Sequence, residues 1–176
     1  MDIFEIRYAL EHITVLVDTR EQPTERAKKR LSEMKFPYER KTLNFGDYSA
    51  KCELSDGTEV DFSASFAVER KMNIDELCNC YCKSRDRFTR EFERARDKNA
   101  KIYLLIENGS WEHIYNGKYR SRMNSNSLAA SVLAWLARYN CQIVFCKSET
   151  SGKIISDIIY REVKERLEKG ECSVLQ

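Results

Sequence analysis

Three acidic residues and one lysine in the first half of the chain have the types and spacing needed for metal-dependent chemistry on a phosphate. Asp18 follows a short apolar run, Asp47 follows a glycine, and Glu69 precedes Lys71 by two positions. Carboxylate oxygens are the ligands that Mg²⁺ and Mn²⁺ prefer, and one or two carboxylates usually suffice beside water and phosphate. Such an ion can polarise a phosphodiester, lower the pKa of a bound water and orient its attack. We therefore predict a site for Mg²⁺ or Mn²⁺ at Asp18, Asp47 and Glu69.

Lys71 has the spacing needed to join these acids. Residues two apart on an extended strand share a face, so its ammonium should point the same way as the Glu69 carboxylate. There it could position the attacking water or neutralise charge that develops on the phosphate. Taken singly, each signal has an ordinary alternative: Asp18 as a helix cap, Asp47 as a turn residue, and Glu69 to Lys71 as a solvated edge. Their combination at strand ends favours the catalytic interpretation.

The elements that must position these residues follow from the spacing of apolar side chains. Short apolar or β-branched runs predict strands over residues 13–17, 38–43, 48–54, 60–68, 101–107 and 142–146, with a hairpin turn over 55–58. Helical spacing predicts helices over residues 24–35, 74–95 with a polar break near Arg85, 111–115, 128–139 and 151–169. Asn73 is the expected cap of the second helix, Asn126 or Ser127 that of the fourth, and Gly170 should end the last. Hairpin strands followed by alternating helices and strands predict an α/β sandwich with a mixed central sheet, as a single domain over residues 1–176.

Composition sets wider limits on the function. The chain has 30 Lys and Arg residues against 28 Asp and Glu residues, a balance that neither supports nor excludes a polyanionic partner. No apolar run approaches the length of a membrane span, and Asp2, Glu5 and Arg7 interrupt the first ten residues, unlike a signal peptide. We expect no membrane partner and a cytoplasmic location, associated with the nucleoid in a bacterium or in the host cytoplasm for a phage protein.

The cysteines allow a different class of function, a zinc or redox protein. Seven cysteines are an odd number for a disulfide framework, and Cys78, Cys80 and Cys82 fall within five residues. Zinc sites usually open with at least two residues between their first ligands, and no second Cys or His pair follows at a suitable spacing. We favour reduced cysteines that pack as small hydrophobic residues.

Three short segments around the acidic residues resemble the signature of the XPF-type nucleases, a branch of the PD-(D/E)XK, or restriction-endonuclease-like, superfamily. They are Val17-Asp18-Thr19-Arg20-Glu21, Gly46-Asp47-Tyr48, and Val68-Glu69-Arg70-Lys71 followed by Asp75. The similarity continues through Arg87-Phe88, the predicted strand over 103–107, and residues 126–146, and covers about residues 15–167. It implies a restriction-endonuclease-like three-layer sandwich with a mixed central sheet flanked by helices.

The resemblance also implies an activity, a metal-dependent DNA endonuclease that acts on branched, flap or otherwise structured DNA in repair or recombination. It implies that Asp18, Asp47 and Glu69 bind the metal, with the Arg70 carbonyl as an extra ligand, and that Lys71 is the catalytic lysine. Supporting ion pairs are implied for Arg20, Glu21, Arg70 and Asp75, and a phosphate contact for Arg87. The main alternative is a catalytically silent DNA-binding or scaffold subunit of a nuclease complex. Such relatives lose the acids or the lysine, whereas this chain keeps them all.

Three features depart from the family's pattern. Ser84-Arg85-Asp86-Arg87 stands in place of an Asn- or Asp-Gly-Arg turn, and Asn108 follows the strand glutamate where Gly is common. The helix-hairpin-helix module that grips DNA in many relatives is not expected in these residues, so a separate DNA-binding partner protein could supply that function.

Two basic segments are candidates for contacts with the DNA backbone. The first contains Arg85, Arg87 and Arg90, and the second contains Lys118, Arg120 and Arg122. The alternative for the first is a solvated helix face with ion pairs along the helix.

The last predicted helix carries a wide apolar stripe, which consists of Ile154, Ile155, Ile158, Ile159, Val163 and Leu167. This stripe either packs on the domain's own sheet or forms a homodimer interface.

Overall fold

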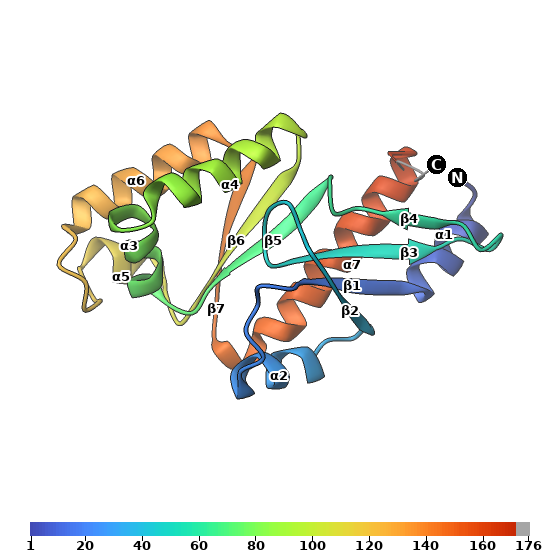
Figure 1. Ribbon diagram of the computed structural model, residues 1–176, viewed down its shortest axis with the longest axis horizontal. Coiled ribbons are helices and arrows are strands. Elements are labelled where there is room, and N and C mark those ends of the chain that lie inside the picture. Colours follow the sequence, from blue (N-terminus) through green and yellow to red (C-terminus); the bar gives the residue numbers. More distant parts are fainter. Residues whose placement is uncertain (172–176) are drawn as a thin grey trace.

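A single mixed sheet forms the centre of the molecule, in a computed structural model that describes residues 1–171 (Figure 1). Its strand order is β2 (Tyr38–Lys41), β1 (Ile13–Asp18), β3 (Tyr48–Glu53), β5 (Phe66–Lys71), β6 (Lys101–Glu107) and β7 (Cys141–Cys146), and the short β4 (Glu59–Asp61) pairs with β3. The pairs β1–β2, β5–β6 and β6–β7 are parallel, while β3 is antiparallel to β1, β4 and β5. The predicted mixed central sheet is confirmed.

The sheet consists of two well-paired halves that meet at a narrow junction. Within residues 1–171, strands β3 and β5 share one register pair, Tyr48 with Val68, whereas β5 and β6 stay in register over six pairs. Figure 1 shows β1 to β4 on one side of this junction and β5 to β7 on the other. Asp47 immediately precedes the junction on β3, and Glu69 immediately follows it on β5.

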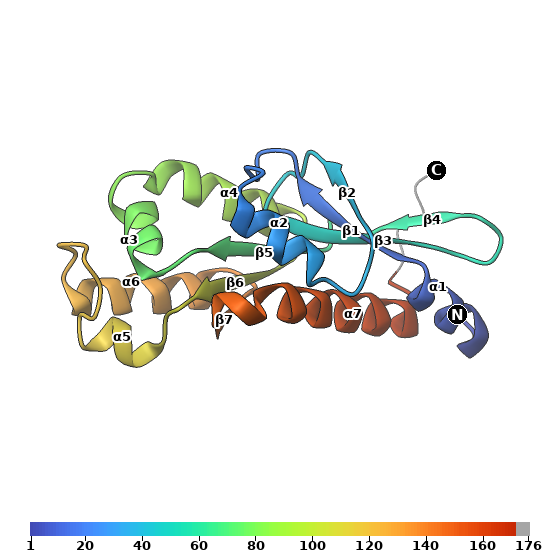
Figure 2. The same ribbon diagram turned by 90° about the horizontal axis from the view of Figure 1, so that it is seen from below.

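Helices cover both faces of the sheet because its strands alternate their side chains between two cores. On β6, Leu104 and Ile106 enter the core beneath α3 (Ile74–Cys82), α4 (Arg85–Asp97), α5 (Trp111–Tyr115) and α6 (Ser125–Arg138). Leu105 enters the other core, beneath α1 (Ile3–Glu11), α2 (Glu25–Ser32) and α7 (Ser151–Lys169). The expected sandwich of a sheet between helical layers is therefore confirmed, and Figure 2 shows α7 running along the molecule beneath the sheet.

The apolar stripe of α7 packs inside the chain itself. Ile155, Ile159, Val163 and Leu167 are buried against the core that contains β1 and β3. Gly152 lets the helix approach α2 closely, because a Cβ at this position would lie 2.4 Å from the carbonyl oxygen of Arg30. The stripe is thus accounted for within the fold, and a homodimer through α7 stays a prediction without support from this face.

Two long elements expected from the sequence are each divided in the structure. The strand expected over residues 60–68 is interrupted, because the N–H groups of Ser65 and Phe66 both donate to the Phe62 carbonyl and turn the chain between β4 and β5. The helix expected over residues 74–95 breaks after Cys82, and Ser84 becomes the residue before α4. The break in the helix lies where the sequence predicted a polar break, near Arg85, whereas the apolar spacing did not reveal the interruption between β4 and β5.

Helix ends were predicted with mixed success. Asn73 caps α3 as expected, and Gly170 ends α7 in the left-handed region at φ +71°. The predicted cap of α6, Asn126 or Ser127, was wrong. The cap is Asn124, whose side-chain oxygen accepts from the N–H groups of both of those residues. Helix α1, capped by Asp2, was not predicted.

Asn108, directly after strand β6, has a backbone conformation that favours glycine. Its φ of +53° lies in the left-handed region, which asparagine tolerates better than most residues. This conformation lets its N–H donate to the Cys146 carbonyl at 2.7 Å and close the end of the β6–β7 pair.

Among the helices of residues 1–171, none is both long and apolar enough to cross a membrane.

Candidate active site

A pocket of about 240 Å³ opens at the edge of the sheet where β5 ends. Its walls come from segments far apart in sequence: the turn after β1, the residue before β3, the end of β5, and the faces of α3 and α4. The predicted site residues that line it are Arg20, Glu21, Asp47, Glu69, Arg70, Lys71 and Arg87. Most of the predicted site therefore converges on one cavity.

Glu69 and Lys71 form a buried ion pair at the back of this pocket. Their side chains leave β5 on the same face, and the Lys71 ammonium donates to Glu69 Oε1. Only 4% of Glu69 and 8% of Lys71 is exposed. The Lys71 ammonium also lies 5.3 Å from the ring centroid of Phe88 on α4, a cation–π contact. The prediction that Glu69 and Lys71 share a face is confirmed.

Asp47 is held beside this pair by hydrogen bonds to the backbone. Its Oδ2 accepts from the Arg70 N–H at 2.8 Å, and its own N–H donates to the Val68 carbonyl at 2.9 Å. The preceding Gly46 has φ +72°, and its N–H donates to Glu91 Oε1 on α4 at 3.0 Å. The backbone of β5 therefore holds the Asp47 carboxylate, and a side chain of α4 holds the residue before it.

The electrostatics of the pocket favour a bound cation. Burial and the neighbouring charge of Glu69 raise the pKa of Asp47 to about 8, although Lys71 opposes this rise. Burial likewise raises the pKa of Glu69 against the effect of Lys71. Burial disfavours the charge of Lys71, but the carboxylates of Glu69 and Asp47 outweigh it and raise the pKa of this ammonium. The charged forms of the two carboxylates are therefore costly where they lie, and a cation bound beside them would favour these charged forms.

The donor set fits Mg²⁺ or Mn²⁺ better than zinc. Asp47 and Glu69 supply two carboxylates, the usual protein contribution to a Mg²⁺ site that also holds water and phosphate. Among residues 1–171, no group of three or more His, Cys, Asp or Glu side chains is close enough to hold a metal ion. Cys78 is buried, Cys80 lines the pocket and Cys82 is exposed, so the three cysteines do not converge.

Asp18 does not join Asp47 and Glu69, contrary to the expected cluster of three carboxylates. It is 1% exposed and does not line the pocket. Its Oδ1 accepts from the N–H and Nε of Arg20, both at 2.7 Å, and its Oδ2 accepts from Arg20 Nη2 at 2.9 Å and from the Leu43 N–H at 2.8 Å. Burial raises the pKa of Asp18, but these hydrogen bonds outweigh it and lower the pKa overall. In this geometry Asp18 orients Arg20, which lines the pocket.

We expect Asp18→Asn to act mainly on stability. The amide retains one acceptor oxygen but turns an NH₂ group toward donors that the carboxylate now satisfies, so the free energy of unfolding should fall by about 3 kcal/mol. The lowered pKa means that the stabilising charge is present near neutral pH and is lost as the pH falls below the ordinary value of 3.8. Urea unfolding at pH 7 and pH 3 checks this, and a difference between variant and wild type that does not shrink at pH 3 would contradict it.

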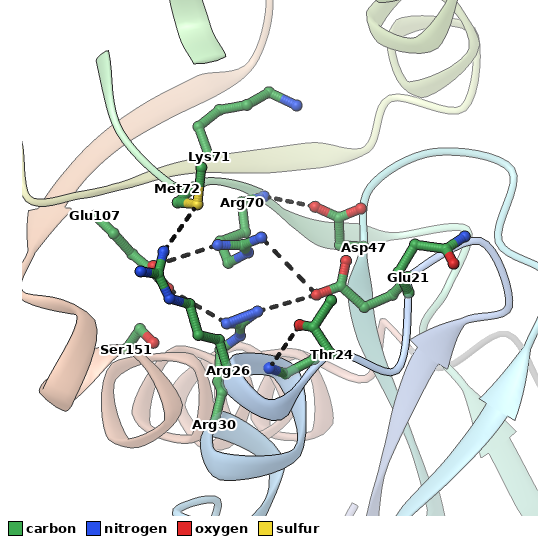
Figure 3. Close-up of polar contacts among 12 residues, drawn as sticks. Glu21, Thr24, Arg26, Arg30, Asp47, Arg70, Lys71, Met72, Glu107 and Ser151 are labelled. Carbon is green, nitrogen blue, oxygen red and sulfur yellow. Dashed lines mark hydrogen bonds and ion pairs between the residues drawn. The ribbon is translucent and has the colours of Figure 1, made fainter. Parts of the chain in front are cut away.

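A network of buried charges lies behind the pocket and reaches both halves of the sheet (Figure 3). Glu21 Oε1 accepts from Arg30 Nη2 at 3.0 Å, and Arg30 Nη1 lies 3.5 Å from Glu107 Oε1. Glu107 Oε2 accepts in turn from Arg70 Nη1 at 3.2 Å, and Arg70 Nη2 lies 3.9 Å from Glu21 Oε1. Tyr48 donates to Glu21 Oε1 at 3.2 Å. The predicted support of the site by Glu21 and Arg70 thus takes the form of a closed ring of ion pairs.

This network connects directly to Asp47 through one residue. Arg70 contributes its guanidinium to the ring and its N–H to the Asp47 carboxylate. Figure 3 shows the Lys71 side chain extending away from the ring, as alternation along β5 requires. A displacement of Arg70 would therefore disturb both the ring and the placement of Asp47.

Asp75 supports a loop instead of the pocket. Its Oδ1 accepts from the N–H groups of Arg120 and Ser121, both at 2.7 Å, and its Oδ2 lies 3.5 Å from Arg120 Nε. The prediction that Asp75 supports the site through an ion pair is corrected accordingly: the pair exists, but it belongs to the loop between α5 and α6.

The predicted basic residues are divided among three places. Arg87 lines the pocket, whereas Arg85 and Arg90 are exposed on α4 outside it. Arg120 and Arg122 line a second pocket beyond α3, and Lys118 is exposed on the same loop without lining either cavity.

Sequence reasoning missed four residues at or behind the pocket: Glu76, Glu91, Arg30 and Glu107. Two of them carried a signal. Glu91 lies four residues after Arg87, so the two share a helix face, and Glu107 ends a strand whose neighbour ends in the predicted site. Arg30, 4% exposed in a polar helix, follows Ala27 by three positions and so lies at the margin of the apolar face.

Comparison with proteins of known structure supports the fold described above. The mixed sheet flanked by helices matches the fold of the XPF nucleases. "XPF from Aeropyrum pernix" superposes with a TM-score of 0.59 and 20% identity, over 88% of this chain and 69% of that chain. "XPF from Aeropyrum pernix, complex with DNA" has a TM-score of 0.59 and 21% identity, over 88% of this chain and 66% of that chain, just under two thirds of its length. No curated protein matches the chain.

The family follows from the sequence match. The model of the ERCC4 domain matches residues 17–158, which include every residue assigned above to the pocket and to the ring of ion pairs. The chain belongs to the ERCC4 domain family.

Proposed function

We propose that the chain is a metal-dependent endonuclease that hydrolyses phosphodiester bonds in branched, flap or otherwise structured DNA during repair or recombination. The observation that carries this proposal is the buried pair of Glu69 and Lys71 beside Asp47 in a pocket of an ERCC4 domain. One XPF structure with a similar fold is a complex with DNA, which supports the choice of substrate. A silent DNA-binding subunit would not need a buried lysine between two carboxylates.

The residues of the pocket divide the chemistry among them. Asp47, Glu69 and the Arg70 carbonyl would hold Mg²⁺ or Mn²⁺, which supplies Lewis acidity toward the phosphate and lowers the pKa of water. In the hydrolysis, a water oxygen bonds to phosphorus, the bond from phosphorus to the leaving sugar oxygen breaks, the water proton passes to solvent, and the leaving oxygen takes up a proton from solvent to become a hydroxyl. Lys71 positions that water or neutralises the charge developing on the phosphate oxygens. Arg87, at the wall of the pocket, binds a phosphate of the substrate.

Cleavage of labelled DNA by the wild-type chain tests this proposal. Duplex, single-stranded, flap and fork DNA are each incubated with Mg²⁺, with Mn²⁺ and with EDTA. We expect cutting of at least one branched or flap substrate with either ion, and none with EDTA. Binding of these substrates without cutting in either ion would overturn the proposal in favour of a silent subunit.

A further inference from the structure

The second pocket lies on a different flank of helix α3 from the candidate active site. Its volume is about 460 Å³, and three cations, Lys83, Arg120 and Arg122, line it together with Asn79 and Ser121. The only carboxylate among the residues that line it is that of Asp75. This cavity is therefore positively charged and carries amide and hydroxyl groups that can bind phosphate oxygens.

The loop that supplies the two arginines is fixed in place. Asp75, in the first turn of α3, accepts hydrogen bonds from the N–H groups of Arg120 and Ser121. Tyr119 donates to the Met123 carbonyl at 2.9 Å, and both side chains pack against the core beneath α3 and α6. The loop is thus held at its centre by Asp75 and at its end by the core.

Helix α3 lies between the two pockets and lines each of them with a different flank. Glu76 and Cys80 line the candidate active site, while Asn79 and Cys82 line the second pocket. An α-helix with its side chains is roughly 10 Å across. One strand of DNA carries a phosphate per roughly 3.4 Å of helix axis, so on the order of three nucleotides span α3.

The exposure of the cations favours a polymer over a small ligand. The Arg120 side chain is 90% exposed, and Lys83 and Arg122 are also exposed. A site for a small anion would enclose its ligand more fully, whereas exposed cations on a surface are suited to a phosphate backbone.

We propose that Lys83, Arg120 and Arg122 form a subsite for backbone phosphates of the DNA strand that is cut in the pocket across α3. Asp75 is a positioning residue that holds this subsite together. The inference rests on the proposed function, and it adds Lys83 and Asp75 to the DNA-binding surface.

The affinity for DNA in EDTA tests the subsite without any cleavage. The double variant Lys83→Ala/Arg122→Ala removes two of the three cations. Lys153→Ala/Arg161→Ala is its matched control, with the same residue types at exposed positions on α7. Fluorescence anisotropy with fork DNA at several NaCl concentrations gives Kd and its salt dependence.

We expect the affinity of the subsite variant to fall by about tenfold and the slope of log K against log[NaCl] to become shallower by roughly 1.5, since each lost phosphate contact removes roughly 0.7 to 0.9. The control should stay within about twofold of the wild type, because its cations lie outside both pockets. Equal affinities and slopes for the two double variants would overturn the subsite.

Two substitutions at Asp75 test its positioning role. Asp75→Asn keeps an acceptor oxygen for the two N–H groups of the loop, whereas Asp75→Ala removes it. We expect Asp75→Ala to raise KM for cleavage by about tenfold with little change in kcat, and Asp75→Asn to restore most of the affinity. Equal effects of the two substitutions, or a loss confined to kcat, would contradict a role through the loop.

The two proposals fail in different ways. A wild-type chain that binds DNA but does not cut it loses the endonuclease function, while the binding assay in EDTA still decides on the subsite. A wild-type chain that cuts DNA, with the subsite variant equal to it in binding and cutting, keeps the function and loses the subsite. A wild-type chain that binds no DNA overturns both.

Discussion

Lys71→Met should lower the rate of DNA cleavage by roughly 10²- to 10³-fold, the loss usual when one group that stabilises a transition state is removed. Methionine keeps the apolar part of the side chain but removes the ammonium, and with it the pair with Glu69 and the cation–π contact with Phe88. The defect should appear in kcat, because the phosphate contacts outside the pocket are unchanged. Single-turnover cleavage of fork DNA and anisotropy in EDTA measure the two effects separately.

Lys101→Met is a closely matched control for this substitution. Lys101 also starts from a strand, pairs with a partly buried glutamate, Glu162, at 2.8 Å, and lies 4.7 Å from the ring centroid of Tyr103. Both variants therefore lose a Lys–Glu pair and a cation–π contact, but only one loses them in the pocket. Similar stability losses with a cleavage defect only in Lys71→Met would assign the lysine to catalysis. Comparable cleavage defects in the two variants would instead mean that the effect is one of folding.

Gly46→Ala should lower the free energy of unfolding by roughly 3 kcal/mol, through both overpacking and a left-handed backbone. A Cβ at this position would lie 2.5 Å from the Cβ of Ala67, and φ is +72°. Relief of this clash requires the chain to move away from β5, which would carry Asp47 away from Glu69. Cleavage should therefore fall with stability, and urea unfolding and single-turnover cleavage measure the two effects.

Gly57→Ala separates the clash from the backbone conformation. Gly57 has φ +83°, close to that of Gly46, but no atom lies within 4 Å of a Cβ built there. It should lose only about 1 kcal/mol, the cost of the left-handed conformation, and keep its cleavage activity. Equal stability losses at the two glycines would show that the approach to Ala67 is not the cause.

The sequence predicted those parts of the fold and site that depend on local spacing. Strand β6 and helix α7 were correct because a continuous apolar run and a helical repeat each specify one element. Glu69 and Lys71 were placed together because strand alternation sets their directions. Asp47 was placed at the same edge because it immediately precedes the strand that pairs with β5.

The parts that failed depend on partners that the spacing of residue types does not reveal, some of them distant in sequence. Whether the Asp18 carboxylate faces a metal or an arginine is decided by where Arg20 and the Leu43 N–H lie, and spacing does not report this. The same applies to Arg30, a cation in a polar helix that becomes buried only because two glutamates from other elements meet it.

The narrow junction between β3 and β5 means that the residues proposed for catalysis lie on two different sides of it. Asp47 lies beside β1 and β3 on one side of the junction, whereas Glu69 and Lys71 lie on β5, which pairs with β6 on the other side. The ring of ion pairs bridges the same boundary, since Glu21 and Arg30 come from one half and Arg70 and Glu107 from the other. It therefore ties the two sides of the junction together, in addition to the backbone hydrogen bonds that hold Asp47 to β5.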